Sequence, residues 1–203
     1  WEAARASPLS GMAVTVTGLD LTEEFVTTGQ VLCDWVGLAD RVALRQGSAV
    51  AMPFEAEAFD AAYMLHVGMN IADKDRLCEE VHRVLRPGAS FGIYDLMRKG
   101  EGDLAYPVPW AQTPEISVVR APQDYRRALV KVGFAVTNEH NRGEFSREFF
   151  ENLKARIAKA DGPAPLGLHI LMGETAPQKV ANMTRNIGRG TLVPVELVAR
   201  KVG

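Results

Sequence analysis

The chain has 203 residues, which fits a single domain over residues 1–203, and its 47% apolar and 24% charged residues are typical of a globular protein. Its 23 Lys and Arg residues are balanced by 25 Asp and Glu, so no basic surplus suggests a nucleic-acid partner and we expect none. No stretch is long and apolar enough to predict a membrane span. Cys33 and Cys78 form neither a metal-type pair nor a disulfide framework, so we expect no metal centre and a reducing, cytoplasmic compartment.

Strand and helix signals alternate along the chain, which is the pattern of a mostly parallel sheet with helices on both faces. The β-branched run over residues 13–20 predicts a buried strand. Thr22 is expected to cap the helix that follows, and Gly37 to end it. The next two predicted strands cover residues 41–46 and 59–65.

The middle of the chain continues the alternation. Asp73 is placed to cap a helix, and Pro87 with Gly88 is expected to end that helix. The sequence then predicts a strand over 90–95, a Pro-rich loop over 101–114, a helix from Pro122 to Gly133 and a strand over 134–137.

Residues 142–190 interrupt the alternation with two predicted helices, the first capped by Ser146 and the second opened by Pro177. Only then does the last strand follow, over residues 191–199, where Pro194 suggests an edge strand or a bulge. The sequence therefore predicts one domain with a helical insertion. We expect this insertion either to cover a substrate or to form a dimer contact.

Two segments carry residue types that suit a nucleoside. Asp20 ends a strand at the edge where open α/β sheets bind ligands, and its two oxygens can accept both hydroxyl hydrogens of a ribose. Gly47 follows the next strand and allows a close backbone approach, and Ser48 then offers a polar side chain for the edge of an adenine. The alternative is structural, with Asp20 capping the next helix and Gly47–Ser48 making a strand-to-loop turn.

The order and spacing of four blocks resemble the class I S-adenosylmethionine-dependent methyltransferase family, in its small-molecule type. This family includes enzymes of ubiquinone, tocopherol, sterol and glycine-betaine pathways, the last represented by sarcosine and dimethylglycine methyltransferases. The Leu-Arg-Pro-Gly block before a strand is especially typical of it. The matching blocks are residues 16–22, 47–54, 59–67 and 83–88, the last followed by the strand 90–95.

The resemblance implies a Rossmann-like fold and S-adenosyl-L-methionine as the cofactor. It implies that Asp20 binds the ribose, that Leu21 packs on the adenine, and that Leu65 lies beside the methionine part. The residues implied to hold the cofactor are Asp20, Leu21, Gly47, Ser48, Ala49 and Leu65.

His66 and Asn70 are the catalytic candidates, because both follow the third strand near the expected position of the methyl group. His66 could orient or deprotonate a substrate, since the ordinary pKa of an imidazole lies near neutrality. The alternatives are a histidine bonded to nearby backbone, and an Asn70 that only shapes its loop.

Two features depart from the family pattern. Ser48 stands where the family usually has Asp or Asn, which predicts weaker adenine binding. The family's first strand and its Gly-x-Gly-x-Gly loop should precede this sequence, so we expect an N-terminally incomplete domain, with residues 1–5 left from the helix after that loop. Because that strand lies between the strands ending at Asp20 and Leu65, its absence predicts a divided sheet.

The expected function is S-adenosylmethionine-dependent methyl transfer to a nitrogen, oxygen or carbon nucleophile of a small molecule. One alternative is a nicotinamide-dependent dehydrogenase, which also places an acidic residue on a ribose but does not require the blocks 47–54 and 83–88. The other is a catalytically degenerate methyltransferase fold that serves as an interaction subunit. A homodimer is compatible with any of these.

Overall fold

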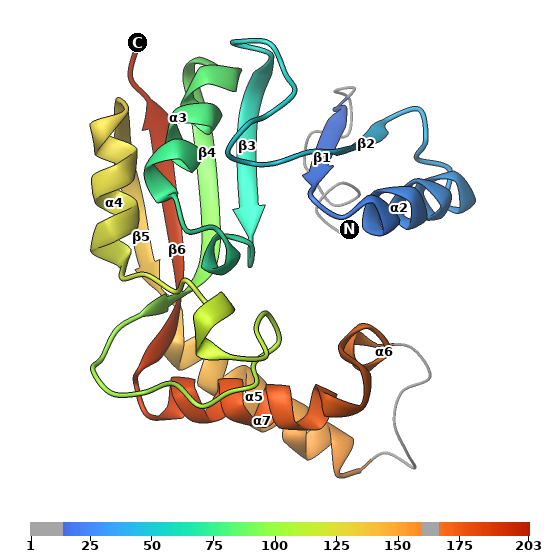
Figure 1. The fold of residues 1–203 in the computed structure, drawn as a ribbon, viewed down its shortest axis with the longest axis vertical. Helices are drawn as coiled ribbons and strands as arrows, with labels where there is room; N and C mark the ends of the chain where they lie inside the picture. The colour runs from blue at the N-terminus through green and yellow to red at the C-terminus, as the bar shows by residue number, and fades with distance from the viewer. Residues whose placement is uncertain (1–13, 160–166) are drawn as a thin grey trace. The chain divides into compact units, whose positions relative to one another are not determined.

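The structure is a computed structural model that describes residues 14–159 and 167–203 (Figure 1). The N-terminal residues 1–5 and most of the loop between the two insertion helices lie outside the described residues. The chain divides into two compact units, residues 1–53 and residues 54–203. Each unit is described by itself.

The first unit contains two parallel strands and one helix. β1 spans Val16–Asp20, α2 spans Glu23–Trp35 and β2 spans Val42–Gln46, which confirms the predicted order strand, helix, strand. The face of α2 that carries Gly29 packs closely on β2, since a Cβ added at Gly29 would lie 2.5 Å from Leu44 Cδ1. Thr22 takes the N-cap position as expected, but its side chain makes no capping hydrogen bond.

The second unit is built on a four-stranded sheet in the order β3-β4-β6-β5. β3 and β4 are parallel, whereas β6 is antiparallel to both of its neighbours. The strands are β3 Phe59–Leu65, β4 Leu85–Arg98, β5 Phe134–Asn141 and β6 Leu192–Lys201.

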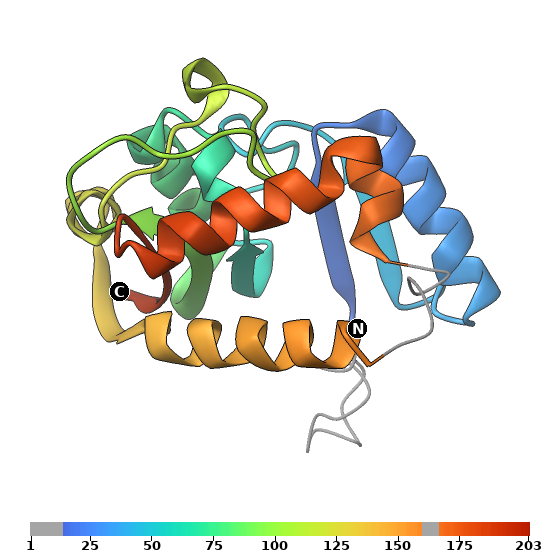
Figure 2. The same ribbon diagram turned by 90° about the horizontal axis from the view of Figure 1, so that it is seen from below.

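Helices surround this sheet in two groups (Figure 1). α3 (Lys74–Val84) and α4 (Pro122–Lys131) pack on each other and on one face of the sheet. α5 (Gly143–Ile157) and α7 (Ala176–Gly188) contact each other beyond the carboxyl ends of β3 and β4 (Figures 1 and 2). The short elements are η1 Gly68–Asn70, η2 Pro114–Ile116, α6 Leu168–Met172 and η3 Gly173–Thr175.

The core of the second unit lies between the sheet and the pair α3 and α4. Its buried apolar side chains come from both helices and from one face of the strands. They include Leu77, Val81, Phe91, Ile93, Tyr125, Leu129, Leu197 and Ala199. On the opposite face of β3, Tyr63 and Leu65 are 68% and 54% exposed.

The strand predicted over 90–95 begins earlier than expected, directly after the helix that Asp73 caps. α3 ends at Val84, and Leu85 already has an extended backbone and pairs with Phe59 at the start of β4. A proline disfavours the helical conformation of the residue before it, so Pro87 also keeps Arg86 out of the helix. β4 therefore passes through Gly88, where the backbone φ of +78° suits a glycine.

Two predictions about the insertion and its flanking strand are also wrong. α5 begins at Gly143, so Ser146 lies in its first turn, where the Ser146 N–H donates to the Arg142 carbonyl, instead of capping it. β6 is an interior strand between β4 and β5, not an edge. Pro194 is tolerated there because β5 has ended beside it, and the Pro194 carbonyl accepts from the Arg142 N–H.

The described strands form two sheets, and β1 and β3 are not paired with each other among the described residues. The sequence predicts a division at this place.

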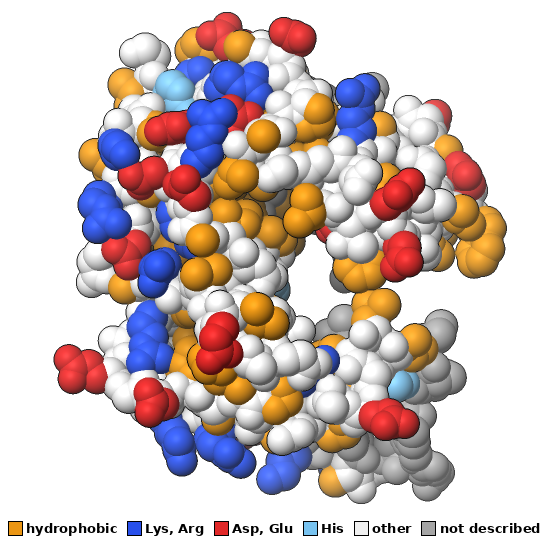
Figure 3. Space-filling model, viewed as in Figure 1, with side chains coloured by type: hydrophobic (Ala, Val, Ile, Leu, Met, Phe, Trp, Pro, Cys, Tyr) orange, Lys and Arg blue, Asp and Glu red, His pale blue; other side chains and the backbone are white. Residues whose placement is uncertain are grey.

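Over α3 and α4, Figure 3 shows basic and acidic side chains interspersed, and several of them form ion pairs such as Arg83–Glu80 at 2.8 Å. Within residues 14–159 and 167–203, no helix has the length and apolarity to cross a membrane.

Candidate functional site

In the first unit, the carboxyl ends of β1 and β2 bring Asp20 and Gly47 together. Asp20 pairs with Gln46 in the parallel register, and the Gly47 N–H donates to the Asp20 carbonyl at 2.9 Å. The Asp20 carboxylate is exposed, and its Oδ1 accepts from the Thr22 N–H at 2.8 Å. This bond gives Asp20 a role in turning the chain, as the structural alternative holds. A carboxylate has about four acceptor positions, so Asp20 can still accept hydrogen bonds from ribose hydroxyls.

Ser48 and Ala49 follow in a tight turn at the same edge. The Ala51 N–H donates to the Ser48 carbonyl at 3.1 Å, and the Val50 N–H donates to Ser48 Oγ at 3.3 Å. A Cβ added at Gly47 would lie 2.9 Å from Leu19 Cδ1, so the backbone is closely packed there. Leu21 follows Asp20 with its side chain exposed, and its carbonyl accepts from Gln46 Nε2 at 3.2 Å. The first unit thus gathers five predicted cofactor residues at one edge: Asp20, Leu21, Gly47, Ser48 and Ala49.

In the second unit, β3 brings Leu65 and His66 to the corresponding carboxyl edge. The His66 N–H donates to the Tyr94 carbonyl at 2.8 Å, and the two rings meet edge to face with their centroids 5.0 Å apart. His66 has a backbone φ of 56°, which is uncommon for a residue with a side chain. Partial burial lowers the pKa of the His66 imidazole, so the neutral ring is favoured at pH 7.

The loop after His66, residues Val67–Ile71, contains Asn70 and is held by side chains from outside it. Asp95 on β4 is fully buried, and its Oδ1 accepts from the Val67 N–H at 3.0 Å. The same carboxylate also accepts from the Gly68 N–H. Asp95 therefore fixes the backbone of this loop at its first two residues.

Lys74 on α3 fixes the loop at other points. Its Nζ donates to the Gly68 carbonyl at 2.7 Å and also to the carbonyl of Ile71. Tyr125 on α4 completes the cluster, because its hydroxyl donates to Asp95 Oδ2 at 3.0 Å and Lys74 Nζ lies 5.2 Å from its ring centroid. We call Lys74, Asp95 and Tyr125 the loop cluster.

Burial changes the acid–base chemistry of the loop cluster. It raises the pKa of the Asp95 carboxyl to about 6, although the hydrogen bonds and the nearby Lys74 oppose this change. Burial also lowers the pKa of the Lys74 ammonium to about 8 and raises the pKa of the Tyr125 phenol. Keeping the carboxylate and the ammonium charged at pH 7 therefore costs folding free energy.

The loop cluster could not be predicted as a unit from the sequence. Asp95 ends a predicted strand and Tyr125 lies on the predicted inner side of a helix, but these features are shared by many structural residues. Lys74 is the first residue of α3, where the helix dipole disfavours a cation, so helix rules give no reason to expect it. Trp110, in the loop after β4, packs in the apolar cluster around Met69 and donates to Ser117 Oγ at 3.0 Å.

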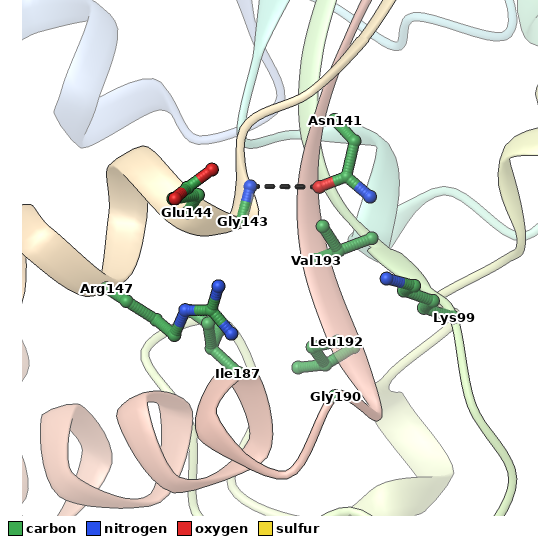
Figure 4. A pocket seen from close by; sticks show the side chains of 9 residues that line it. All are labelled: Lys99, Asn141, Gly143, Glu144, Arg147, Ile187, Gly190, Leu192 and Val193. Carbon is green, nitrogen blue, oxygen red and sulfur yellow. Dashed lines mark hydrogen bonds between the residues drawn. The ribbon is translucent and has the colours of Figure 1, made fainter.

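A recess of the second unit lies elsewhere, between β6, α5 and α7 (Figure 4), and has a volume of about 260 Å³. Lys99 and Arg147 point into it, with the Glu144 carboxylate at its rim, and all three side chains are exposed. The recess contains none of the predicted site residues.

Comparison with known proteins finds a family match over the first part of the chain. The family described as "Methyltransferase domain" matches residues 3–93. A sterol 24-C-methyltransferase of Gibberella zeae is 34% identical over 80 residues, which cover 39% of this chain and 21% of that protein. The chain thus matches well under two thirds of this relative's length.

Solved structures share the fold over nearly the whole chain. A phosphoethanolamine N-methyltransferase of Haemonchus contortus, in complex with S-adenosyl-L-methionine, has a TM-score of 0.76 at 17% identity and covers 100% of this chain and 45% of that one. A geranyl diphosphate C-methyltransferase of Streptomyces coelicolor has a TM-score of 0.72 at 16% identity and covers 99% and 65%. These likenesses extend the fold assignment beyond the matched residues 3–93.

Proposed function

We propose that this chain, which carries a class I methyltransferase domain, belongs to a protein that transfers a methyl group from S-adenosylmethionine to a small molecule. The observation that supports this most is the edge of the first unit, where Asp20 and the Gly47–Ser48 turn meet. All eight predicted site residues lie within residues 3–93, the part that the family matches. The family match favours this function over a nicotinamide-dependent dehydrogenase.

The residues present fit the cofactor by their chemistry. Asp20 would accept hydrogen bonds from the ribose hydroxyls, and Leu21 would pack on the adenine. Ser48 Oγ and the Ala49 backbone would meet the adenine edge, with weaker binding than the usual aspartate or asparagine would give. We assign Leu65 to the methionine part of the cofactor.

The reaction asks more of alignment than of acid–base groups. When bound, the cofactor would supply a sulfonium methyl group: an electron pair of the acceptor, a lone pair on nitrogen or oxygen or a π pair on carbon, would bond to the methyl carbon as the carbon–sulfur pair leaves with sulfur. His66 and Asn70 would orient the acceptor, and His66 in its neutral form would take the proton that an N–H or O–H acceptor loses. The names of similar proteins include phosphoethanolamine, sterols and geranyl diphosphate. A panel of candidate acceptors for activity assays should therefore begin with nitrogen and carbon acceptors.

Residues 142–190 are proposed as a cover over the acceptor within a single domain of residues 1–203. α5 and α7 contribute Phe150, Met183 and Ile187 to the apolar cluster that includes Met69 of the loop after β3. A homodimer contact is the rival role, and the exposed Phe145 and Phe149 favour it. Light scattering separates the two, since a cover leaves a monomer.

We also propose a reducing cytoplasmic location, because Cys33 and Cys78 are buried and unpaired. We propose no nucleic-acid partner.

Replacing Asp20 tests the proposed cofactor site. Asp20→Ala should weaken S-adenosylmethionine binding about 10- to 100-fold in calorimetry, because hydrogen bonds to a charged acceptor are lost. Asp40→Ala, also an exposed aspartate of the first unit, is the matched control and should leave the affinity unchanged. Equal affinities of the Asp20→Ala and parent proteins would remove Asp20 from the site, and absence of binding by the parent would favour the interaction-subunit alternative.

A further inference from the structure

We propose that Asp95 is a positioning residue for methyl transfer, because its carboxylate holds the backbone of Val67–Ile71 and so fixes His66 and Asn70 at the carboxyl edge of β3. That this position matters for methyl transfer rests on the proposed function. The contacts themselves do not depend on that function, and all of them lie within residues 54–203.

Three elements meet at this one loop. Asp95 comes from β4, Lys74 from α3 and Tyr125 from α4. Asp95 and Lys74 bond main-chain atoms of the loop, and Tyr125 bonds Asp95. The shape of the loop is therefore set by side chains outside it, as a site that must keep a fixed geometry requires.

The loop lies directly against the loop cluster. A Cβ added at Gly68 would come within 2.2 Å of Asp95 Oδ2 and 2.5 Å of the Tyr125 hydroxyl. On its other side the loop packs against the proposed cover, since Met69 is buried in a cluster with Phe150 and Ile187. Asp95 thus fixes a segment that connects the end of β3 to the cover.

The charge of Asp95 argues against a merely structural role. Burial raises the pKa of this carboxyl, so its ionised form at pH 7 is unfavourable for folding, and of the side chains that act on it, Tyr125 and Lys74, only Lys74 is a cation. An asparagine of the same shape would accept the Val67 bond without a buried charge, although the Tyr125 hydroxyl would then have to accept from its amide nitrogen instead of donating. Costly buried charges of this kind are concentrated at functional sites.

The test compares Asp95→Asn and Tyr125→Phe with the parent protein and with Glu80→Gln. Glu80 is the matched control, because it is a carboxylate that is 3% exposed and bonded to Arg76 and Arg83 on the same helix as Lys74. Histidine ring signals are recorded by NMR across pH, with the His66 signal assigned by its loss in His66→Gln. S-adenosylmethionine affinity is measured by calorimetry, and turnover with the acceptor found by the panel.

Asp95→Asn should shift the His66 signal and its titration, and should lower turnover at least tenfold while the dissociation constant for S-adenosylmethionine stays within threefold. Tyr125→Phe should move both readouts in the same direction by less, and it serves as the test if Asp95→Asn does not fold. Glu80→Gln should move neither. An unchanged His66 signal in a folded variant, or an equal shift in Glu80→Gln, would overturn the proposal. A parent protein that binds no S-adenosylmethionine would overturn the proposed function instead, and the NMR result would still decide the role of Asp95.

Discussion

At the scale of single residues, Asp95 makes folding depend on pH in an unusual direction. Its pKa is raised to about 6 in the folded state, whereas an unfolded aspartate titrates near 3.9. The folded state therefore binds the proton more tightly between these values, and the free energy of unfolding contributed by Asp95 falls as pH rises from about 4 to about 6. The change should be of the order of 3 kcal/mol, and it should level off above pH 6.

Denaturant unfolding of the parent and Asp95→Asn at pH 4.5 and pH 7 measures this contribution. The asparagine cannot ionise, so the stability difference between the two proteins should change by about 2 kcal/mol across that interval. Glu80→Gln should show no such change, because its carboxylate is paired with two arginines. A pH-independent difference between parent and Asp95→Asn would show that the carboxyl titrates normally in the folded state.

The individual site residues were predictable to different degrees. Asp20 and the Gly47–Ser48 turn follow strand ends, and the parallel register of β1 and β2 brings such residues together, so sequence order alone places them at one edge. The loop cluster was not predictable as a unit, because Lys74 and Tyr125 are 51 positions apart in numbering and meet only through the packing of α3 on α4.

At the scale of elements, α3 offers a direct measure of helix capping. Asp73 accepts from the Arg76 N–H at 2.8 Å, so Asp73→Ala should lower the free energy of unfolding by about 1 kcal/mol. Thr22→Ala is the control at the start of α2, where the threonine side chain makes no capping bond, and should cost clearly less. Equal losses in denaturant unfolding would mean that the Asp73 bond contributes nothing to stability.

The elements themselves were largely predictable, and their ends were not. β3 has the predicted bounds because its apolar run is flanked by clear loop signals. β4 and β5 extend beyond their predicted ends because pairing with β6 continues the ladder past the apolar residues, as far as Arg98 and Asn141. The interior position of β6 depends on the order of strands in the sheet, which Pro194 gives no means of predicting.

At the scale of the whole chain, the two units differ in how much apolar surface they bury. Among the described residues, Cys33 is the only buried apolar side chain of the first unit, and all the others belong to residues 54–203. Burial of apolar surface is the main source of stability, so the first unit should open more readily.

Hydrogen exchange followed by mass spectrometry checks this difference. Backbone amides of β1 and β2 should exchange before those of β4 and β6, because local opening of the first unit exposes little apolar surface. Equal protection of all four strands would show that both units unfold together.

The way the loop after β3 is held has a consequence for how acceptor preference can change. Gly68 and Met69 are buried, whereas Val67 is 43% exposed and Asn70 is also exposed. Because the loop's shape comes from Lys74, Asp95 and Tyr125, substitutions at the outward positions 67 and 70 can leave the backbone unchanged. Natural variation, or a laboratory library limited to those two positions, can then sample new acceptors while the scaffold stays the same. Variation at Gly68 would disturb the scaffold itself.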